Sequence, residues 1–212
     1  MVNQEATDQT TTKRAHVVRN RVSPLLGPLL MTAVVAACTT GSGNIVTETR
    51  EVGEFDRIEV SSGIAVDLFV EAGSPTQVTT HFDDNLQDKI RTEVVDGTLI
   101  IEADGSFTVT GSGRKVEVEV PSLSALAVSG GANVQGVGAV DQLAVQADGG
   151  SRVDLSDLIV QAMTVDVSAG AQLEVTTESS IEGEVSGGAG LTVGGDPATR
   201  NLDVSGGGSV SG

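Results

Sequence analysis

Hydrophobic and polar side chains alternate along most of the chain beyond residue 44. In residues 58–60, 64–70 and 116–120, apolar side chains occupy every second position, with mostly acidic, polar or small residues between them. A period of two places neighbouring side chains on opposite faces of a strand, so these segments predict β-strands with one buried face. Pro121 ends the third segment, because proline cannot donate to a strand ladder.

Two shorter signals complete the prediction of an all-β chain. Residues 94–101 contain Asp96-Gly97 between two apolar stretches, which predicts a hairpin because both turn positions need a positive φ. Residues 83–89 are the one segment with helical character, and they are long enough for a single turn or a loop.

The second half contains an internal repeat. Five blocks read as an apolar residue, a small polar residue, two residues that are mostly glycine, and another small residue. Their first residues lie 19, 20, 18 and 19 positions apart, at Val128, Ala147, Val167, Val185 and Val204. Each block is flanked by alternating apolar positions, so a unit reads as strand, small-residue corner, strand and looser connection.

The repeat length predicts the fold class. A strand-helix-strand crossover needs ~30 residues, so units of this length are expected to stack as turns built from strands. We predict a right-handed parallel β-helix of about 19 residues per turn, with three short strands in each turn. Glycine is expected at the corners because the backbone bends sharply there with neighbouring turns directly above and below. Residues 44–120 are expected either to continue the stack or to form a hairpin-rich cap.

Composition changes the expected core. The chain has no Trp, no Tyr and four Phe, against 27 Gly. An interior of interlocking aromatic rings is therefore excluded, and we expect a core of Val, Leu, Ile and Ala that repeats from layer to layer.

The N-terminus predicts export. A basic segment with Lys13 and Arg14 precedes an apolar run at 25–37, which is shorter than the ~20 residues that a membrane-spanning helix needs. The run ends in Val-Ala-Ala-Cys, which resembles the lipobox of bacterial lipoproteins. We predict a signal peptide at 1–37, lipid attachment at Cys38 with a polar tether at 38–43, and one domain at 44–212. Cys38 is the single cysteine, which favours a lipid anchor over a disulfide.

The net charge limits the classes of partner that the chain is expected to bind. Residues 38–212 retain 8 of the 12 basic and 27 of the 29 acidic residues, a formal charge near −19. Such a charge repels phosphate backbones and anionic lipid head groups, which excludes nucleic acid as an expected partner. Solubility alone is a sufficient explanation for much of this acidity.

Catalytic chemistry finds little support in the sequence. His81 is the single histidine of residues 38–212, and we interpret it as an exposed residue at a strand end. Carboxylate pairs at Asp154 with Asp157 and at Asp83 with Asp84 satisfy the residue types that a glycosidase needs. The repeats, however, lack the aromatic residues that usually line sugar subsites. We predict no catalytic residue.

Metal sites find little support either. Residues 148–154 loosely resemble a glycine-rich calcium repeat, but the other blocks replace the acidic residues, and Arg152 falls inside the would-be loop. One histidine and one lipidated cysteine cannot form a zinc site without relying on carboxylates. We therefore predict no metal ligand and no cofactor.

The chain resembles the auto-transporter adhesin head domain, or GIN domain, found in many bacterial lipoproteins. The resemblance is carried by residues 43–48, Val52, Phe55, Ile58, Val60, and residues 63–68, 84–86, 92–94, 97–99 and 120–121, together with the Ser-Gly-Gly corners. The resemblance spans roughly residues 43–212 and implies a membrane-tethered, β-helical surface domain.

The predicted function is therefore non-catalytic surface binding, adhesion or structural presentation outside the cytoplasmic membrane. The expected partners are the membrane, through the N-terminal lipid, and a cell-surface glycan or protein, and self-association stays open. The alternative is a carbohydrate-active enzyme, a polysaccharide lyase or glycosidase, built on the same scaffold.

Overall fold

The computed structural model describes residues 39–109 and 111–212, so the predicted signal peptide and Cys38 lie outside the described residues. The described residues belong to one compact unit. The strands are β1 (Thr39–Thr40), β2 (Ile45–Arg50), β3 (Arg57–Val60), β4 (Ala65–Val70), β5 (Gln77–Asp83), β6 (Ile90–Val95), β7 (Thr98–Ala103), β8 (Phe107–Thr108), β9 (Lys115–Val120), β10 (Ala125–Val128), β11 (Asn133–Ala147), β12 (Arg152–Val167), β13 (Gln172–Val185), β14 (Gly190–Gly194), β15 (Thr199–Val204) and β16 (Ser209–Ser211). One 3-10 helix, η1 (Gln87–Lys89), supplies the single turn expected at 83–89.

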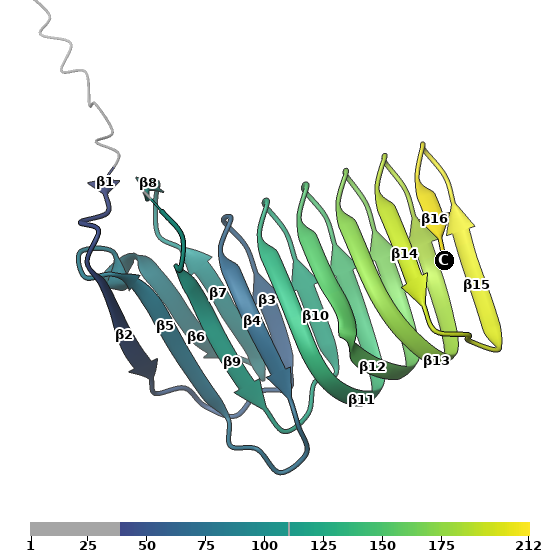
Figure 1. Ribbon diagram of the computed structural model, residues 1–212, viewed down its shortest axis with the longest axis horizontal. Coiled ribbons are helices and arrows are strands. Elements are labelled where there is room, and N and C mark those ends of the chain that lie inside the picture. The colour runs from purple at the N-terminus through teal and green to yellow at the C-terminus, as the bar shows by residue number, and fades with distance from the viewer. Residues whose placement is uncertain (1–38, 110) are drawn as a thin grey trace, which may run out of the picture. The chain divides into compact units, whose positions relative to one another are not determined.

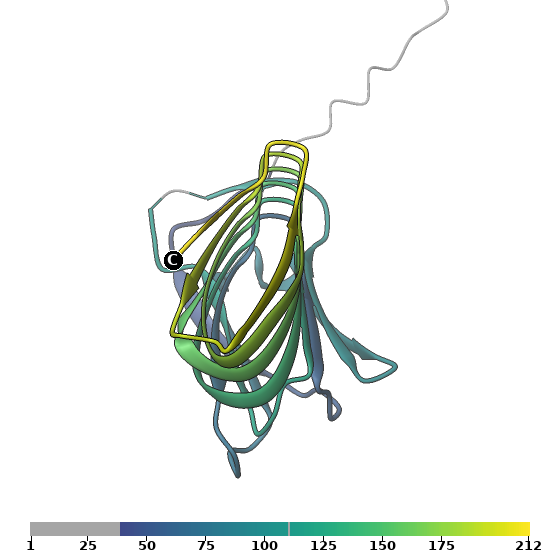
Figure 2. The same ribbon diagram turned by 90° about the vertical axis from the view of Figure 1, so that its right-hand side faces the viewer.

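The prediction of an all-β chain is confirmed, but the prediction of a right-handed parallel β-helix is wrong. Fourteen strands form one mixed sheet, in which the β2–β5, β5–β9 and β6–β7 ladders are antiparallel. The sheet curls around its core until it is nearly closed, like a barrel (Figures 1 and 2). Nor do three short strands make a turn: β11, β12 and β13 are continuous strands of 15, 16 and 14 residues.

Each of these long strands belongs to two walls of the sheet. Wall A consists of β6, β7, β3, β10, the second halves of β11, β12 and β13, and β15. Wall B consists of β2, β5, β9, β4, the first halves of β11, β12 and β13, then β14 and β16. The long strands bend at the lower edge in Figure 1, where the register between them shifts.

The spacing of the repeat is confirmed by the strand register. On wall A, Ala125 pairs with Ala144, Ala144 with Thr164, Thr164 with Glu182, and Glu182 with Asn201. All these ladders are parallel, and their offsets equal the spacing of the sequence blocks. Each repeat therefore lies directly on the one before it.

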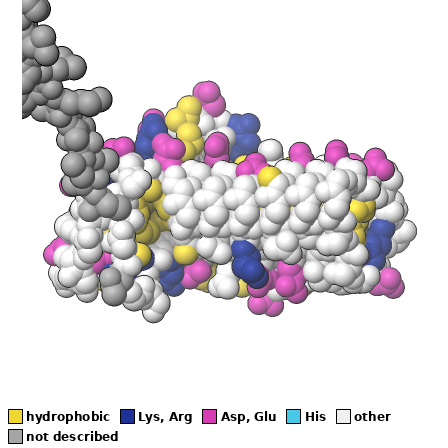
Figure 3. All heavy atoms as spheres, turned by 90° about the horizontal axis from the view of Figure 1, so that it is seen from above, with side chains coloured by type: hydrophobic (Ala, Val, Ile, Leu, Met, Phe, Trp, Pro, Cys, Tyr) yellow, Lys and Arg dark blue, Asp and Glu magenta, His cyan; other side chains and the backbone are white. Residues whose placement is uncertain are grey.

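The small-residue corners join the two walls at the upper edge. The Ser129 carbonyl accepts the N–H of Ala132 at 3.1 Å, and the two residues between them, Gly130 and Gly131, have φ values of 58° and 74°. Two central residues with positive φ define a type I′ turn. Successive turns bond to one another, the Gly131 N–H donating to Gly149 at 3.1 Å. Figure 3 shows the resulting ridge as ribs of small residues with charged side chains along its sides.

The core lies between the walls and consists almost wholly of aliphatic side chains, as the composition predicts. The inward positions of the alternating segments are buried, among them Ile58, Val66, Leu68, Val116 and Val118. The same inward rows continue through every repeat to residue 193, so each layer buries its side chains against the next.

The hairpin predicted at Asp96-Gly97 is confirmed, since β6 and β7 pair antiparallel and both turn residues have a positive φ. Among residues 39–109 and 111–212, no helix reaches the length and hydropathy of a membrane span.

Two glycines with positive φ test how much of the fold depends on backbone contact. A Cβ on Gly138 would lie 2.0 Å from the Val70 carbonyl oxygen, whereas a Cβ on Gly150 would meet nothing within 4 Å. We expect Gly150→Ala to cost about 1–2 kcal/mol, the strain of a left-handed conformation. Gly138→Ala should cost at least about twice that, because the ladder between β4 and β11 must open. Urea unfolding of both variants measures the difference, and equal losses would contradict this account.

Candidate binding surface

The outward side chains of wall A form a surface that we call the shelf. Because the repeats are in register, equivalent outward positions line up across the strands from β7 to β15. The shelf residues are Thr98, Arg57, Glu59, Ala125, Ala127, Ala144, Gln146, Thr164, Asp166, Glu182, Glu184, Asn201 and Asp203.

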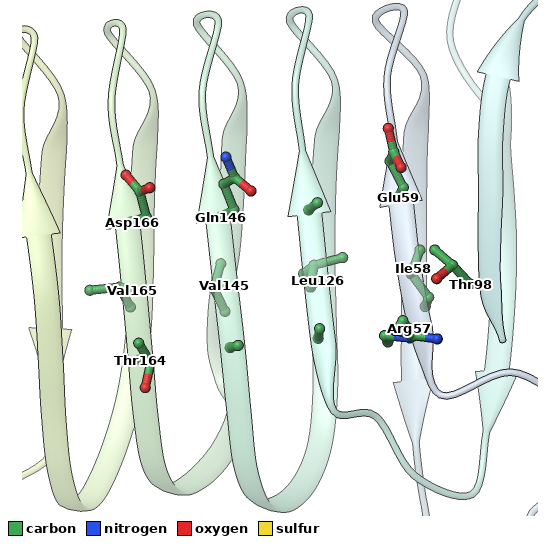
Figure 4. Close-up of a pocket in the computed structure, with 13 residues that line it drawn as sticks. Arg57, Ile58, Glu59, Thr98, Leu126, Val145, Gln146, Thr164, Val165 and Asp166 are labelled. Carbon is green, nitrogen blue, oxygen red and sulfur yellow. The ribbon is translucent and has the colours of Figure 1, made fainter. Parts of the chain in front are cut away.

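A hollow of about 310 Å³ lies in the shelf above β3, β10, β11 and β12 (Figure 4). Its floor carries Ala125, Ala127 and Ala144, whose methyl groups are shorter than the side chains on either side. Arg57 and Glu59 form one end, and the side chains of β12 form the other. The hollow therefore offers an apolar floor between polar ends, open to solvent.

Two further hollows continue the shelf towards the last repeat. One of about 370 Å³ shares Ala144 and Thr164 with the first, and one of about 430 Å³ shares Thr164, Val165 and Asp166. Neighbouring strands are ~4.8 Å apart, so the seven strands from β7 to β15 span ~29 Å. The shelf is thus long and shallow, a form that suits an extended partner better than a small molecule.

The far half of the shelf is acidic. Asp166 pairs with Glu184, and Glu184 with Asp203, so three carboxylates lie side by side on three consecutive strands. All three are exposed, and within the part of the chain that the structure describes none has a salt-bridge partner. Like charges directly opposite each other destabilise a sheet. Folding alone therefore does not account for this row.

His81 lies elsewhere, within β5 on wall B, and the prediction that it is an exposed strand-end residue is wrong. Its side chain is 22% exposed, with Nε2 3.1 Å from a Glu117 carboxylate oxygen and Nδ1 3.0 Å from the Thr47 hydroxyl. Lys115 also bonds Glu117, at 2.7 Å, and Asp67, at 2.6 Å. These carboxylates raise the pKa of Lys115, and Lys115, with a smaller contribution from His81, lowers that of Glu117. Lys115 and Glu117 therefore stay ionised, and the hydrogen bonds of the cluster tie β5, β9 and β4 together.

The two carboxylates at Asp83 and Asp84 serve the structure. Asp83 is fully buried, and both of its oxygens accept hydrogen bonds from Arg114, one of them at 2.9 Å. The Arg114 guanidinium lowers the pKa of Asp83 to about 2, and bonds from Ser42 and Asn44 lower that of Asp84. A glycosidase acid needs the opposite shift, because it must hold a proton near neutral pH.

Of the second carboxylate pair, Asp157 lies within β12, in register with Val137 of β11. Asp154 accepts hydrogen bonds from the backbone and hydroxyl of Ser156, at 3.1 and 2.6 Å. Asp148, in the segment that loosely resembles a calcium repeat, lies in the corner turn before β12. Within residues 39–109 and 111–212, no three His, Cys, Asp or Glu side chains lie close enough to hold a metal ion.

The shelf was not predicted, although the repeat contains its signal. The residue three positions before each block is outward-facing, so aligning the five blocks also aligns one shelf row. Its composition changes from small and apolar to polar along the stack, through Ala125, Ala144, Thr164, Glu182 and Asn201.

Comparison with known proteins identifies a matching family model and solved structures with a similar fold. A family model described as "Putative auto-transporter adhesin, head GIN domain" matches residues 54–140 and 127–197. A crystal structure of a "putative adhesin" from Bacteroides fragilis is 20% identical, with a TM-score of 0.52 over 81% of this chain and 98% of that one. Another, from Parabacteroides distasonis, is 20% identical, with a TM-score of 0.57 over 82% and 99%. At such identities the likeness shows the fold alone. Curated proteins give no match.

The Asp83–Arg114 pair predicts acid sensitivity. Because the pKa of Asp83 is about 2 in the folded protein and 3.8 in an ordinary carboxyl, its stabilising effect is complete above pH ~4 and is lost as the pH falls towards 2. Asp83→Asn should lower the urea midpoint at pH 7 and flatten its fall between pH 4 and 2. Asp104→Asn, an exchange of a carboxylate in the loop after β7, should leave that pH dependence as in the wild type. An unchanged slope in Asp83→Asn would refute the assignment.

Proposed function

The chain belongs to the auto-transporter adhesin head GIN domain family, and from that premise we propose an exported, lipid-anchored bacterial surface protein that binds an extended partner along the shelf. The observation that carries the binding role is the group of three adjoining hollows on wall A, which share Thr164. The domain at 44–212 is the binding part, and residues 1–37 act as the signal peptide that is removed on export.

In this proposal Cys38 carries the lipid and becomes the first residue of the mature protein. The sequence before it supports this role, since a basic segment, an apolar run and small residues precede the cysteine in that order. Acyl chains contribute ~0.8 kcal/mol per buried methylene, so two or three chains hold a protein on a membrane.

The segment after Cys38 determines how far the domain can move away from the lipid anchor. Gly41 donates to the Thr108 carbonyl at 2.8 Å, Asn85 to that of Thr40 at 2.9 Å, and Ser42 to the Asn85 side chain at 2.9 Å. β1 also pairs with β8 in parallel. The described part of the predicted tether is thus bonded to the domain, and a lipid on Cys38 would hold this end of the domain within a few ångströms of the head groups.

The binding role is favoured over the carbohydrate-active enzyme by the direction of the resolved carboxyl shifts. The pKa values of Asp83, Asp84 and Glu117 are all lowered, by hydrogen bonds from neighbouring polar and basic side chains. The shelf, in turn, presents a shallow floor of methyl groups and a row of exposed carboxylates. Both features suit reversible contact with a long partner.

Replacing the cysteine tests the anchor. Cys38→Ser cannot form the thioether, so the protein should lose labelling by radioactive palmitate and move from the membrane fraction to the soluble fraction. Thr39→Ser, a change at the next residue that keeps the thiol, should leave both properties as in the wild type. Membrane retention of the serine variant without label would disprove the lipid anchor.

Filling the hollow tests the binding surface. In the fragment 39–212, Ala144→Tyr places a ring over the alanine floor, and we expect retention on a cell-envelope preparation of the source organism to fall about tenfold, a loss of ~1.4 kcal/mol. Tyrosine is a good strand residue, so the fold should survive. The matched control is Ala65→Tyr on the outward face of wall B, which should bind normally. Equal retention of both variants would contradict the binding role of the shelf.

A further inference from the structure

We infer that the partner of the shelf is an extended polypeptide segment in which an aliphatic side chain is followed by basic side chains at alternate positions. This inference rests on the proposed function of the shelf and adds the chemistry of its ligand. The shelf combines a hollow with an apolar floor and an acidic row that begins with Asp166 at the β12 end of the hollow, and a matching partner must combine the same two features in the same order.

The acidic row determines the charge of the partner. Asp166, Glu184 and Asp203 lie in register, and Glu182 lies two residues before Glu184 on β13. Within residues 39–109 and 111–212 none of these four carboxylates forms a salt bridge, so no ion pair inside the protein offsets their like charges. Lys or Arg side chains of a partner would remove that repulsion and make charge-assisted hydrogen bonds.

The hollow determines which side chain of the partner precedes the basic ones. Its floor of Ala125, Ala127 and Ala144 accepts an aliphatic side chain and offers it few polar atoms, while Arg57 and Glu59 limit the hollow at one end. Along an extended peptide, side chains on one face recur every ~6.6 Å, against ~4.8 Å between strands. Flexible Lys side chains can absorb this difference, so a peptide crossing the strands can place one side chain in the hollow and two or three basic groups on the acidic row.

Other ligand classes fit the shelf less well. A divalent cation needs several oxygen ligands within about 2.6 Å, and within the described part of the chain no group of three such side chains is close enough. Anionic polymers are repelled by the row. A neutral glycan would leave the carboxylates uncompensated, and the shelf residues include no aromatic side chain for a sugar ring to stack on.

The direct test measures binding of a fluorescent peptide with one Leu followed by Lys at three alternate positions to the fragment 39–212, which contains the whole described core. We expect binding that weakens as salt is added, and a further loss when the Leu is replaced by Ser. The triple variant Asp166→Asn, Glu184→Gln and Asp203→Asn should bind about tenfold more weakly, because it lacks three ion pairs. Its urea midpoint should equal or exceed that of the wild type, which separates lost binding from lost folding.

The matched control changes the net charge equally away from the shelf. The variant Glu54→Gln, Glu71→Gln and Glu174→Gln should bind the peptide as the wild type does, whereas an equal loss would mean non-specific attraction and overturn the inference. Binding of a neutral cell-wall oligosaccharide in place of the peptide, blocked by Ala144→Tyr, would also overturn it, while the proposed function of the shelf would stand. If Ala144→Tyr leaves retention on the envelope unchanged, the proposed function itself fails.

Discussion

The structure depends on a turn of two residues with positive φ that recurs at the same place in every repeat. Each turn sends the chain from wall A to wall B, and the turns at Gly131, Gly150, Gly170 and Gly188 each donate a backbone hydrogen bond to the next turn along the ridge. Glycine fills most of these positions, while Ser62 and Ala169 take the same left-handed conformation with a side chain. Register in both walls follows from this stack, since a displaced turn would move one strand of each wall together.

In-register stacking also explains how the repeated scaffold presents polar and charged side chains in continuous outward rows. Inward positions are almost all aliphatic, because each is packed against the same position of its neighbours. Outward positions carry no such constraint, so their composition can change along the stack, from the alanines of β10 and β11 to the carboxylates of β12, β13 and β15. The shelf is the sum of these unconstrained positions, and the scaffold supplies its length and straightness.

Local patterns predicted much of this architecture, and the failures have physical causes. Alternation identified the buried faces, and block spacing identified which residues pair on wall A. The antiparallel pairing of Ile45 with Asp83 was not predicted, because it joins distant segments and is decided by the core that they share. The long strands were read as several short ones, because a strand that bends at a register shift, as β12 does after Leu155, carries no strong turn signal there. Of the predicted site, Cys38 lies outside the described residues, and the shelf became visible only once the fold showed which face each position occupies.

The independence of neighbouring repeats has an evolutionary consequence. A repeat makes its main contacts with the one before and the one after it, so gene duplication could add a unit, or deletion remove one, without redesigning the rest. Each added unit would lengthen the shelf by ~4.8 Å and contribute one more outward position to each row. Relatives with different numbers of repeats would then differ in the length of the partner segment that they contact.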